Sequence, residues 1–332
     1  MMRFDIVGGG AIGLLYGARL ALAGHLVTIW TRTAEQAERL MDDGIELVSQ
    51  GMIQVADVNA FPLHDCSRAA VQSVEGETKT NHAILIAVKQ TQLTVDLLEQ
   101  IGKLAGPDTL VIGLQNGVGH VDKLLQAVPN ANVLTAVTTE GALRHGPRTV
   151  EHTGDGIIAF GDPVGEMGRK SASNDEQMER MKQSEQEIRH KMLLNTFSSA
   201  GITSELSKEM NNRIYQKLLV NAVINPLTAL FDVRNGELPQ HPRRASLMRS
   251  LFEETVRVLA AAGMTGDEDR WQQVLQVCER TAGNISSMLA DVRAGRQTEI
   301  EWINGSVCRL AAQYGLEAPV NASVVQLVQA MK

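Results

Sequence analysis

The chain has 332 residues, which is more than one domain of ordinary size holds, so we expect two domains. Its formal net charge of −7 argues against nucleic acid as a partner, and the lack of an apolar run of about 18 residues argues against a membrane span. Met1-Met2-Arg3 leads into a strand without a signal-peptide pattern, which favours the cytoplasm, and the 3 cysteines and 8 histidines lack metal-ligand spacing, so no metal site is expected.

The N-terminal segment has the pattern of a dinucleotide-binding turn. Arg3–Val7 is predicted as a strand and Leu14–Ala23 as a helix, with a glycine-rich turn between them. In such a turn one glycine allows the tight bend, a second lets the backbone approach a pyrophosphate, and a third permits close packing of helix on strand. The helix N-terminus offers free N–H groups to the phosphates. A glycine turn without a ligand is the alternative. The residues predicted to bind a cofactor here are Gly8, Gly9, Gly10, Ala11, Ile12 and Gly13.

The residues after the second predicted strand indicate which cofactor is preferred. The strand His25–Trp30 runs into Thr31-Arg32-Thr33, where an NAD-selective site carries Asp or Glu for the ribose 2′-hydroxyl. An arginine at this position can bind a 2′-phosphate through charge-assisted hydrogen bonds worth about 1.5–3 kcal/mol. Arg32 therefore predicts NADP (NADPH) rather than NAD. The alternative is an ordinary exposed arginine.

Strands and helices continue to alternate through the first half of the chain. The polar stretch 67–81 is predicted as a surface connection, and 162–187 as a solvated connection or an exposed helix start. The alternation predicts an α/β fold, with an N-terminal Rossmann-type doubly wound parallel sheet over residues 1–206. The predicted elements are the helix Glu35–Asp43, a strand pair Ile45–Ser49 and Met52–Val55, the strand His82–Val88, the helix Leu93–Leu104, the strands Thr109–Leu114 and Asn132–Thr138, extended segments over 147–160, the helix Ile188–Ser199 and the strand Ile202–Leu206.

Three residues follow predicted strands at the edge of the sheet where ligands bind in such folds. They are Lys89, Asn116 and Ala142. Asn116 has the groups to hydrogen-bond a nicotinamide amide or a ribose, although Asn116-Gly117 is also an ordinary turn pair. Lys89 is equally compatible with a solvated strand end. His152 alternates with Val150 and is a strand histidine rather than a catalytic base.

From Lys208 onward the pattern is almost entirely helical, which predicts a C-terminal all-helical domain over residues 207–332. Lys217, Asn221 and Asn225 recur every four residues and form one polar stripe in an otherwise apolar helix. A cation and two amides in a buried helix need hydrogen-bond or charge partners, so the stripe predicts a binding site. The positive charge of Lys217 would attract an anionic substrate to it. A lysine snorkelling beside two core amides is the alternative. The amphipathic segments are Arg243–Ala262, Asp267–Thr281 and Arg296–Tyr314.

A second polar cluster lies further along the helical half. Asn284, Ser286 and Ser287 precede an apolar run and have the composition of helix caps, although Ser287 could instead donate to a substrate carboxylate. Thr298 and Glu301 have the spacing of a capping box at the start of a helix. The box accounts for Glu301 but leaves Glu299 without an explanation.

Together these motifs resemble the ketopantoate reductase (2-dehydropantoate 2-reductase) family over essentially the whole chain. The resemblance implies an NADPH-dependent reduction of 2-dehydropantoate to (R)-pantoate, a step toward pantothenate and coenzyme A. The polar stretch 162–187 departs from the compact members. The matching elements are Gly8–Gly13, Lys89, Gln115-Asn116-Gly117, Arg213–Leu238 with its Asn-Pro-Leu-Thr-Ala-Leu segment, Asn284–Met288 with Asp291, and Thr298-Glu299-Ile300.

The resemblance also implies a role for each matched residue. Lys217 would be the proton donor to the substrate carbonyl, with Glu299 at the junction of cofactor and substrate and Arg32 facing the 2′-phosphate. The substrate would be bound by Lys217, Asn221, Asn225, Asn235 and Ser287 with Asn284 nearby, and NADP by the glycine turn, Lys89, Asn116, Ala142 and Glu299. The expected partner is a small-molecule 2-oxo acid, and both a monomer and a homodimer fit. A reductase of another branched 2-oxo acid or an opine-type substrate, a non-catalytic NADPH-binding regulator and an interaction scaffold are the alternatives.

Overall fold

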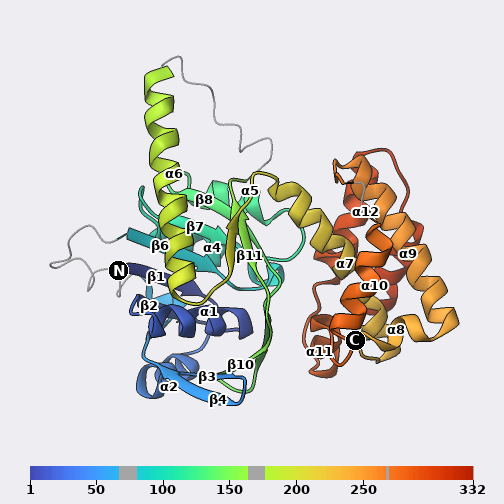
Figure 1. Ribbon diagram of the computed structural model, residues 1–332, viewed down its shortest axis with the longest axis horizontal. Coiled ribbons are helices and arrows are strands. Elements are labelled where there is room, and N and C mark those ends of the chain that lie inside the picture. Colours follow the sequence, from blue (N-terminus) through green and yellow to red (C-terminus); the bar gives the residue numbers. More distant parts are fainter. Residues whose placement is uncertain (67–80, 164–175, 267–268, 332) are drawn as a thin grey trace. The chain divides into compact units, whose positions relative to one another are not determined.

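The computed structural model describes residues 1–66, 81–163, 176–266 and 269–331 (Figure 1). The chain divides into two compact units, one of Met1–Gln115 with Gly119–Met210 and the other of Asn116–Val118 with Asn211–Lys332. The predictions for 67–80 and 164–175, and for the first two positions of Asp267–Thr281, lie outside the described residues. Over the described ranges, no helix has the length and apolar character that crossing a membrane requires.

The first unit is built on an eight-stranded sheet in the order β12-β11-β8-β7-β6-β1-β2-β5. Neighbouring strands are parallel except β8 and β11, which are antiparallel. The sheet grows in one direction from β1 through β2 and in the other from β6 through β7 and β8, which confirms the predicted doubly wound parallel sheet. The strands are β1 (Met2–Val7), β2 (Leu26–Thr31), β5 (Asn59–Pro62), β6 (Asn81–Ile86), β7 (Leu110–Gly113), β8 (Asn132–Thr138), β11 (Ile158–Gly161) and β12 (Ser204–Leu206).

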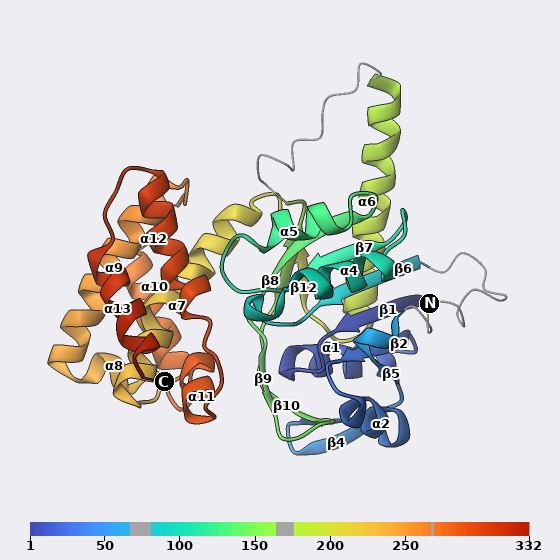
Figure 2. The ribbon, with the colours of Figure 1, turned by 180° about the vertical axis from the view of Figure 1, so that it is seen from behind.

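Helices cover both faces of this sheet. Successive side chains of a strand point to opposite faces, and β1 follows that rule: Ile6 packs into one apolar core and Val7 into another. The first core includes residues of α1 (Ala11–Leu22) and α6 (Glu176–Ser199), and the second includes residues of α4 (Val95–Leu104) and α5 (His120–Ala127). Accordingly α6 lies in front of the sheet in Figure 1, and α4 and α5 lie in front of it in Figure 2. A further helix of the described residues is α2 (Ala34–Asp43).

A smaller sheet of four strands belongs to the same unit, in the order β4-β3-β10-β9. The predicted strand pair is confirmed as the antiparallel strands β3 (Ile45–Ser49) and β4 (Met52–Ala56). Gln50 and Gly51 form their turn with φ of 50° and 77°. The other two strands are β9 (Gly141–Arg144) and β10 (Thr149–Gly154). Ala142 follows β8 as predicted, but the prediction missed that it lies within a strand of its own, β9, where it pairs with His152 of β10.

The long polar stretch 162–187 is helical in its second part. Helix α6 begins at Glu176, twelve positions before the predicted start at Ile188, so of the two alternatives for this stretch the exposed helix start is confirmed for its second part. The side chains of 184–189 are mostly exposed, which explains why an apolar pattern for a helix appears only later in the sequence.

The second unit is helical, as predicted. Its long helix α7 (Met210–Phe231) contributes Leu218, Leu219, Ala222 and Val223 to one apolar core. The same core takes in side chains from most of the other helices, so these pack as one body. The helices are α8 (Glu237–Gln240), α9 (Pro242–Ala261), α10 (Arg270–Arg280), α11 (Ser287–Arg293), α12 (Asn304–Gln313) and α13 (Pro319–Gln329).

The prediction of one helix over Arg296–Tyr314 was wrong. A 3-10 turn covers Ile300–Trp302, and α12 begins only at Asn304. Ile303 separates them with φ −102° and ψ −88°, which lies outside the helical region and interrupts the hydrogen-bond ladder. The capping box of Thr298 and Glu301 was wrong for the same reason, because no α-helix begins at Thr298.

Candidate active site

The glycine turn lies between β1 and α1, where the strand order of the large sheet reverses. Gly8 has φ +118°, a conformation that side-chain-bearing residues rarely adopt, and its N–H donates to the Trp30 carbonyl at 2.9 Å. A Cβ on Gly13 would lie 2.0 Å from the Gly8 carbonyl oxygen, so only glycine fits there. A Cβ on Gly10 would meet no atom of the described part of the chain within 4 Å. The turn therefore combines a forced close packing at Gly13 with open space beside Gly10, which fits a phosphate approaching the backbone.

Two side chains that sequence reasoning missed hold this turn. Gln36 of α2 donates through Nε2 to the Gly9 carbonyl at 2.8 Å and to the Pro147 carbonyl at 2.7 Å. Arg144 of β9 donates through Nη1 to the same Gly9 carbonyl at 3.0 Å. The contact between Arg144 and Gly9 joins positions 135 residues apart, so no local pattern signals it.

Arg32 and Lys89 follow the two strands that flank β1. Arg32 comes directly after β2 and is exposed. Lys89 lies three residues after β6, is half-buried, and precedes the 3-10 turn Gln90–Gln92 as its N-cap. Both therefore stand at the carboxyl edge of parallel strands, where ligands bind in open α/β sheets.

The stripe predicted on the helical half lies on α7. Lys217 and Asn221 are half-buried, and Asn225 is 9% exposed. Their neighbours Leu218, Ala222 and Ile224 are buried in the core of the second unit. Among the described residues, the side-chain amides of Asn221 and Asn225 have no hydrogen-bond partner. Amide groups so placed are available to a bound molecule.

Glu299 completes the surroundings of Lys217. Its side chain is buried, with 6% of the residue exposed, and its Oε2 accepts a hydrogen bond from Asn116 Nδ2 at 3.1 Å. Burial lowers the pKa of Lys217 to about 8, while the negative charge of Glu299 opposes that shift. Desolvation therefore outweighs the carboxylate, which the sequence left open. The structure brings Asn116, Lys217 and Glu299 together in the second unit.

The other predicted substrate residues lie around the start of α11. Ser286 is the N-cap, since its Oγ accepts from Leu289 N–H at 3.1 Å, so the capping reading holds for this serine. Asn284 and Ser287 beside it are exposed. Asn235 donates through Nδ2 to Thr281 Oγ1 at 2.9 Å, and its buried Oδ1 has no partner among the described residues.

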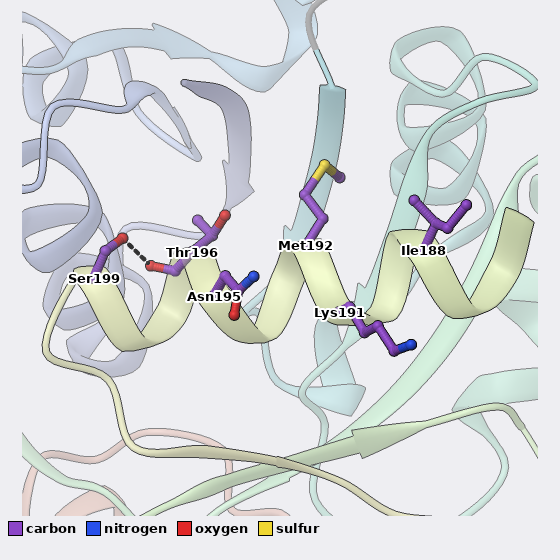
Figure 3. A pocket seen from close by; sticks show the side chains of 6 residues that line it. All are labelled: Ile188, Lys191, Met192, Asn195, Thr196 and Ser199. Carbon is purple, nitrogen blue, oxygen red and sulfur yellow. Dashed lines mark hydrogen bonds between the residues drawn. The ribbon is translucent and has the colours of Figure 1, made fainter.

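One hollow of the first unit lies apart from these residues. A hollow on the first unit is lined by α6 alone, through Ile188, Lys191, Met192, Asn195, Thr196 and Ser199 (Figure 3). It contains none of the candidate residues. Within the described part of the chain, no group of three or more His, Cys, Asp or Glu side chains is arranged to hold a metal ion.

Comparison with known proteins assigns the chain to a family. The family described as "Ketopantoate reductase PanE/ApbA" matches residues 4–165, and its C-terminal counterpart matches residues 209–332. The 2-dehydropantoate 2-reductase of Bacillus subtilis is 33% identical over 322 residues, which cover 96% of this chain and 93% of the relative. That of Halobacterium salinarum is 29% identical over 99% of this chain and 98% of its own. The chain therefore belongs to the ketopantoate reductase family, a family of oxidoreductases, and the resemblance is confirmed.

Solved structures agree with this assignment. The probable 2-dehydropantoate 2-reductase of Bacillus subtilis has a TM-score of 0.74 at 30% identity and covers 100% of both chains. A ternary structure of D-mandelate dehydrogenase with NADH and anilino(oxo)acetate has a TM-score of 0.81 at 26% identity, covering 99% of this chain and 98% of that one. A relative of this fold thus binds a nicotinamide cofactor together with an oxo acid analogue.

Proposed function

We propose that this enzyme reduces 2-dehydropantoate to (R)-pantoate with NADPH, a step toward pantothenate and coenzyme A, and that Lys217 donates the proton. The observation that carries the proposal is the half-buried Lys217 of α7, whose pKa burial lowers to about 8 beside the buried carboxylate of Glu299. The names of the curated relatives supply the substrate.

The residues of the first unit fit a reduced dinucleotide. The open space beside Gly10 accommodates the pyrophosphate, and the N-terminus of α1 stabilises its charge. Arg32 binds the adenosine 2′-phosphate, a group that NADPH carries and NADH lacks. Lys89 and Ala142 complete the cofactor contacts of this unit. When bound, the reduced nicotinamide supplies the hydride.

Lys217 serves the carbonyl oxygen of the substrate. With a pKa of about 8 the amine is mostly protonated at neutral pH, yet it is a stronger acid than an ordinary lysine. Its positive charge stabilises the oxygen as negative charge develops there, and its proton then neutralises the product alkoxide. Glu299 keeps enough of the amine protonated by opposing the desolvation.

The amides and hydroxyls around Lys217 orient the oxo acid. Asn221 and Asn225 lie one and two turns further along the same stripe and offer donors to carboxylate or hydroxyl oxygens. Asn235 contributes its buried Oδ1, which has no partner in the described part of the chain. Asn284 and Ser287, both exposed, complete the set of substrate contacts.

A second candidate is a reductase of another 2-oxo acid, with NADH as a possible reductant. The similarity to D-mandelate dehydrogenase, whose structure holds NADH and anilino(oxo)acetate, favours this candidate. Such a reductase uses the same glycine turn and Lys217. It differs in the side chains that contact the part of the substrate beyond the 2-oxo acid group.

Oxidation of NADPH by the purified protein tests the proposal. We would compare 2-dehydropantoate with pyruvate, 2-oxoisovalerate, 2-oxoisocaproate and benzoylformate, and repeat each assay with NADH. The proposal expects the highest kcat/KM for 2-dehydropantoate with NADPH. A higher value for benzoylformate with NADH would replace it by the second candidate. Tight NADPH binding without turnover of any acid would indicate the non-catalytic regulator.

A further inference from the structure

Helix α7 contains a proline in its interior, next to the predicted substrate residue Asn225. Pro226 has no N–H, so it cannot donate to the carbonyl of Ala222, four residues earlier. Ala222 is fully buried, so water does not replace the missing donor. A buried carbonyl without a partner is destabilising, and the helix needs another donor at this turn.

Asn304, the first residue of α12, supplies that donor. Its Nδ2 donates to the Ala222 carbonyl oxygen at 2.9 Å, and the asparagine is itself fully buried. The contact crosses 82 positions of the sequence and fills the place left by Pro226. An apolar side chain of similar size would pack equally well here but would leave the Ala222 carbonyl unpaired.

The orientation of Asn304 is fixed by a chain of buried groups. Its Nδ2 also donates to Asn321 Oδ1 at 2.9 Å, and Asn321 Nδ2 donates to Glu254 Oε1 at 2.9 Å. The Glu254 carboxylate in turn accepts the backbone N–H groups of Asn321 at 2.7 Å and Val320 at 3.1 Å, in the first turn of α13. A carboxylate is stabilised at a helix N-terminus, so Glu254 fixes the end of this series of hydrogen bonds.

The anchored amide acts on the turn of α7 that carries the stripe. Ala222 follows Asn221 directly, and Pro226 follows Asn225 directly. With its own hydrogen bond missing, the turn between them depends on Asn304 for its geometry. Both Nδ2 hydrogens of Asn304 are used, while its buried Oδ1 has no partner among the described residues. The Nδ2 group of Asn304, rather than its Oδ1, therefore makes the hydrogen bonds that hold this part of α7.

We propose that Asn304 is a positioning residue. By donating to Ala222 it sets the turn 221–226 of α7, and through that turn it sets the affinity for the oxo acid. The proposal rests on the proposed function in one respect, namely that Asn221 and Asn225 bind the substrate. It involves no contact between Asn304 and substrate or cofactor.

A double-mutant cycle tests this proposal. Pro226→Ala restores the N–H that α7 lacks, so it makes Asn304 dispensable for Ala222. We expect Asn304→Ala to raise the KM for the oxo acid about tenfold in the natural background, with the Kd for NADPH unchanged, and to change KM less than about twofold in the Pro226→Ala background. Thr255→Val is the matched control, since it removes a buried contact to Asn321 without touching Ala222.

The outcomes separate positioning from plain structural support. A lower Tm for Asn304→Ala with an unchanged KM overturns the proposal, as does an equal rise in KM in both backgrounds. If Asn304→Ala alone does not fold, the double variant with Pro226→Ala should fold, and failure of both overturns the proposal. The free energies of unfolding of the same variants are measured without substrate. The coupling between Asn304→Ala and Pro226→Ala in these free energies can therefore be determined even if 2-dehydropantoate proves not to be the substrate.

Discussion

The glycine turn of the first unit and the polar stripe of α7 in the second serve function in opposite ways. The turn works because its glycines carry no side chain: a Cβ on Gly13 would lie 2.0 Å from the Gly8 carbonyl oxygen, whereas a Cβ on Gly10 would meet no atom of the described residues within 4 Å. The stripe works through side chains that are present, a lysine and two asparagines set among apolar neighbours. The comparison teaches that adding atoms should damage the first region and removing atoms should damage the second.

The sharpest contrast within the turn is between two glycines. Gly13→Ala forces its methyl into backbone and should lower both the Tm and NADPH binding, to the point where binding is no longer measurable. Gly10→Ala has room in the protein, so its Tm should stay near the natural value, while the methyl intrudes on the pyrophosphate and raises the Kd for NADPH about 5- to 150-fold. Thermal unfolding and fluorescence titration with NADPH measure both quantities. An unchanged Kd for NADPH in Gly10→Ala would contradict the proposal that the pyrophosphate lies in the open space beside Gly10.

Arg32 extends the comparison, because its proposed contact with the cofactor depends on the charge of a side chain rather than on open space. Arg32→Ala should raise the KM for NADPH about 10- to 150-fold and leave the KM for NADH nearly unchanged, since only NADPH carries the 2′-phosphate. Arg39→Ala on the surface of α2 is the control of equal charge change. Equal effects on the two cofactors would rule out a 2′-phosphate contact.

Glu299 provides a pH-dependent test in the second region. Its charge raises the pKa of Lys217, so Glu299→Gln should let that pKa fall below about 8. The amine must be protonated to act as the acid, so activity is lost as pH rises through this pKa. The alkaline limb of kcat should therefore move to lower pH in Glu299→Gln. Asn116→Ala, which removes the hydrogen bond to Glu299 but keeps the charge, should move it less. A limb that moves upward would contradict the assignment.

Arg144 should give the smallest effect. It shares the Gly9 carbonyl with Gln36, so Arg144→Gln removes a side-chain hydrogen bond to this carbonyl and leaves that of Gln36 in place. We expect the Kd for NADPH to rise about 2- to 10-fold. The control is Arg148→Gln, whose guanidinium contacts Glu46 rather than the turn. A similar change in both variants would show that only the net charge matters.

The sequence predicted the elements whose apolar pattern is local. The buried strand β6 and the strand β8 are apolar through most of their length, and the glycine turn lies directly between a strand and a helix. The predictions missed β5, β9 and α5, which have only 4 residues, 4 residues and 8 residues. The two strands pair with segments elsewhere in the chain, which local propensity does not report.

The residues of the candidate site also fall into those that a local sequence pattern predicts and those that it does not. Spacing alone placed Lys217, Asn221 and Asn225 on one helix, because a four-residue repeat is a local signal. It could not place Arg144 at the glycine turn or Asn304 at the Ala222 carbonyl, since those contacts join residues 135 and 82 positions apart. A proline within an apolar helix was the available hint that a donor had to come from elsewhere.

The most direct test of the account is the turnover of Lys217→Ala, measured together with the Kd for NADPH on the same sample. The account predicts that kcat falls about 10²- to 10⁴-fold, as expected for loss of a general acid, and that the alkaline limb near pH 8 disappears. NADPH binding should stay within about twofold, because the glycine turn is untouched. Near-normal kcat in Lys217→Ala would contradict the central claim that the stripe of α7 carries the chemistry.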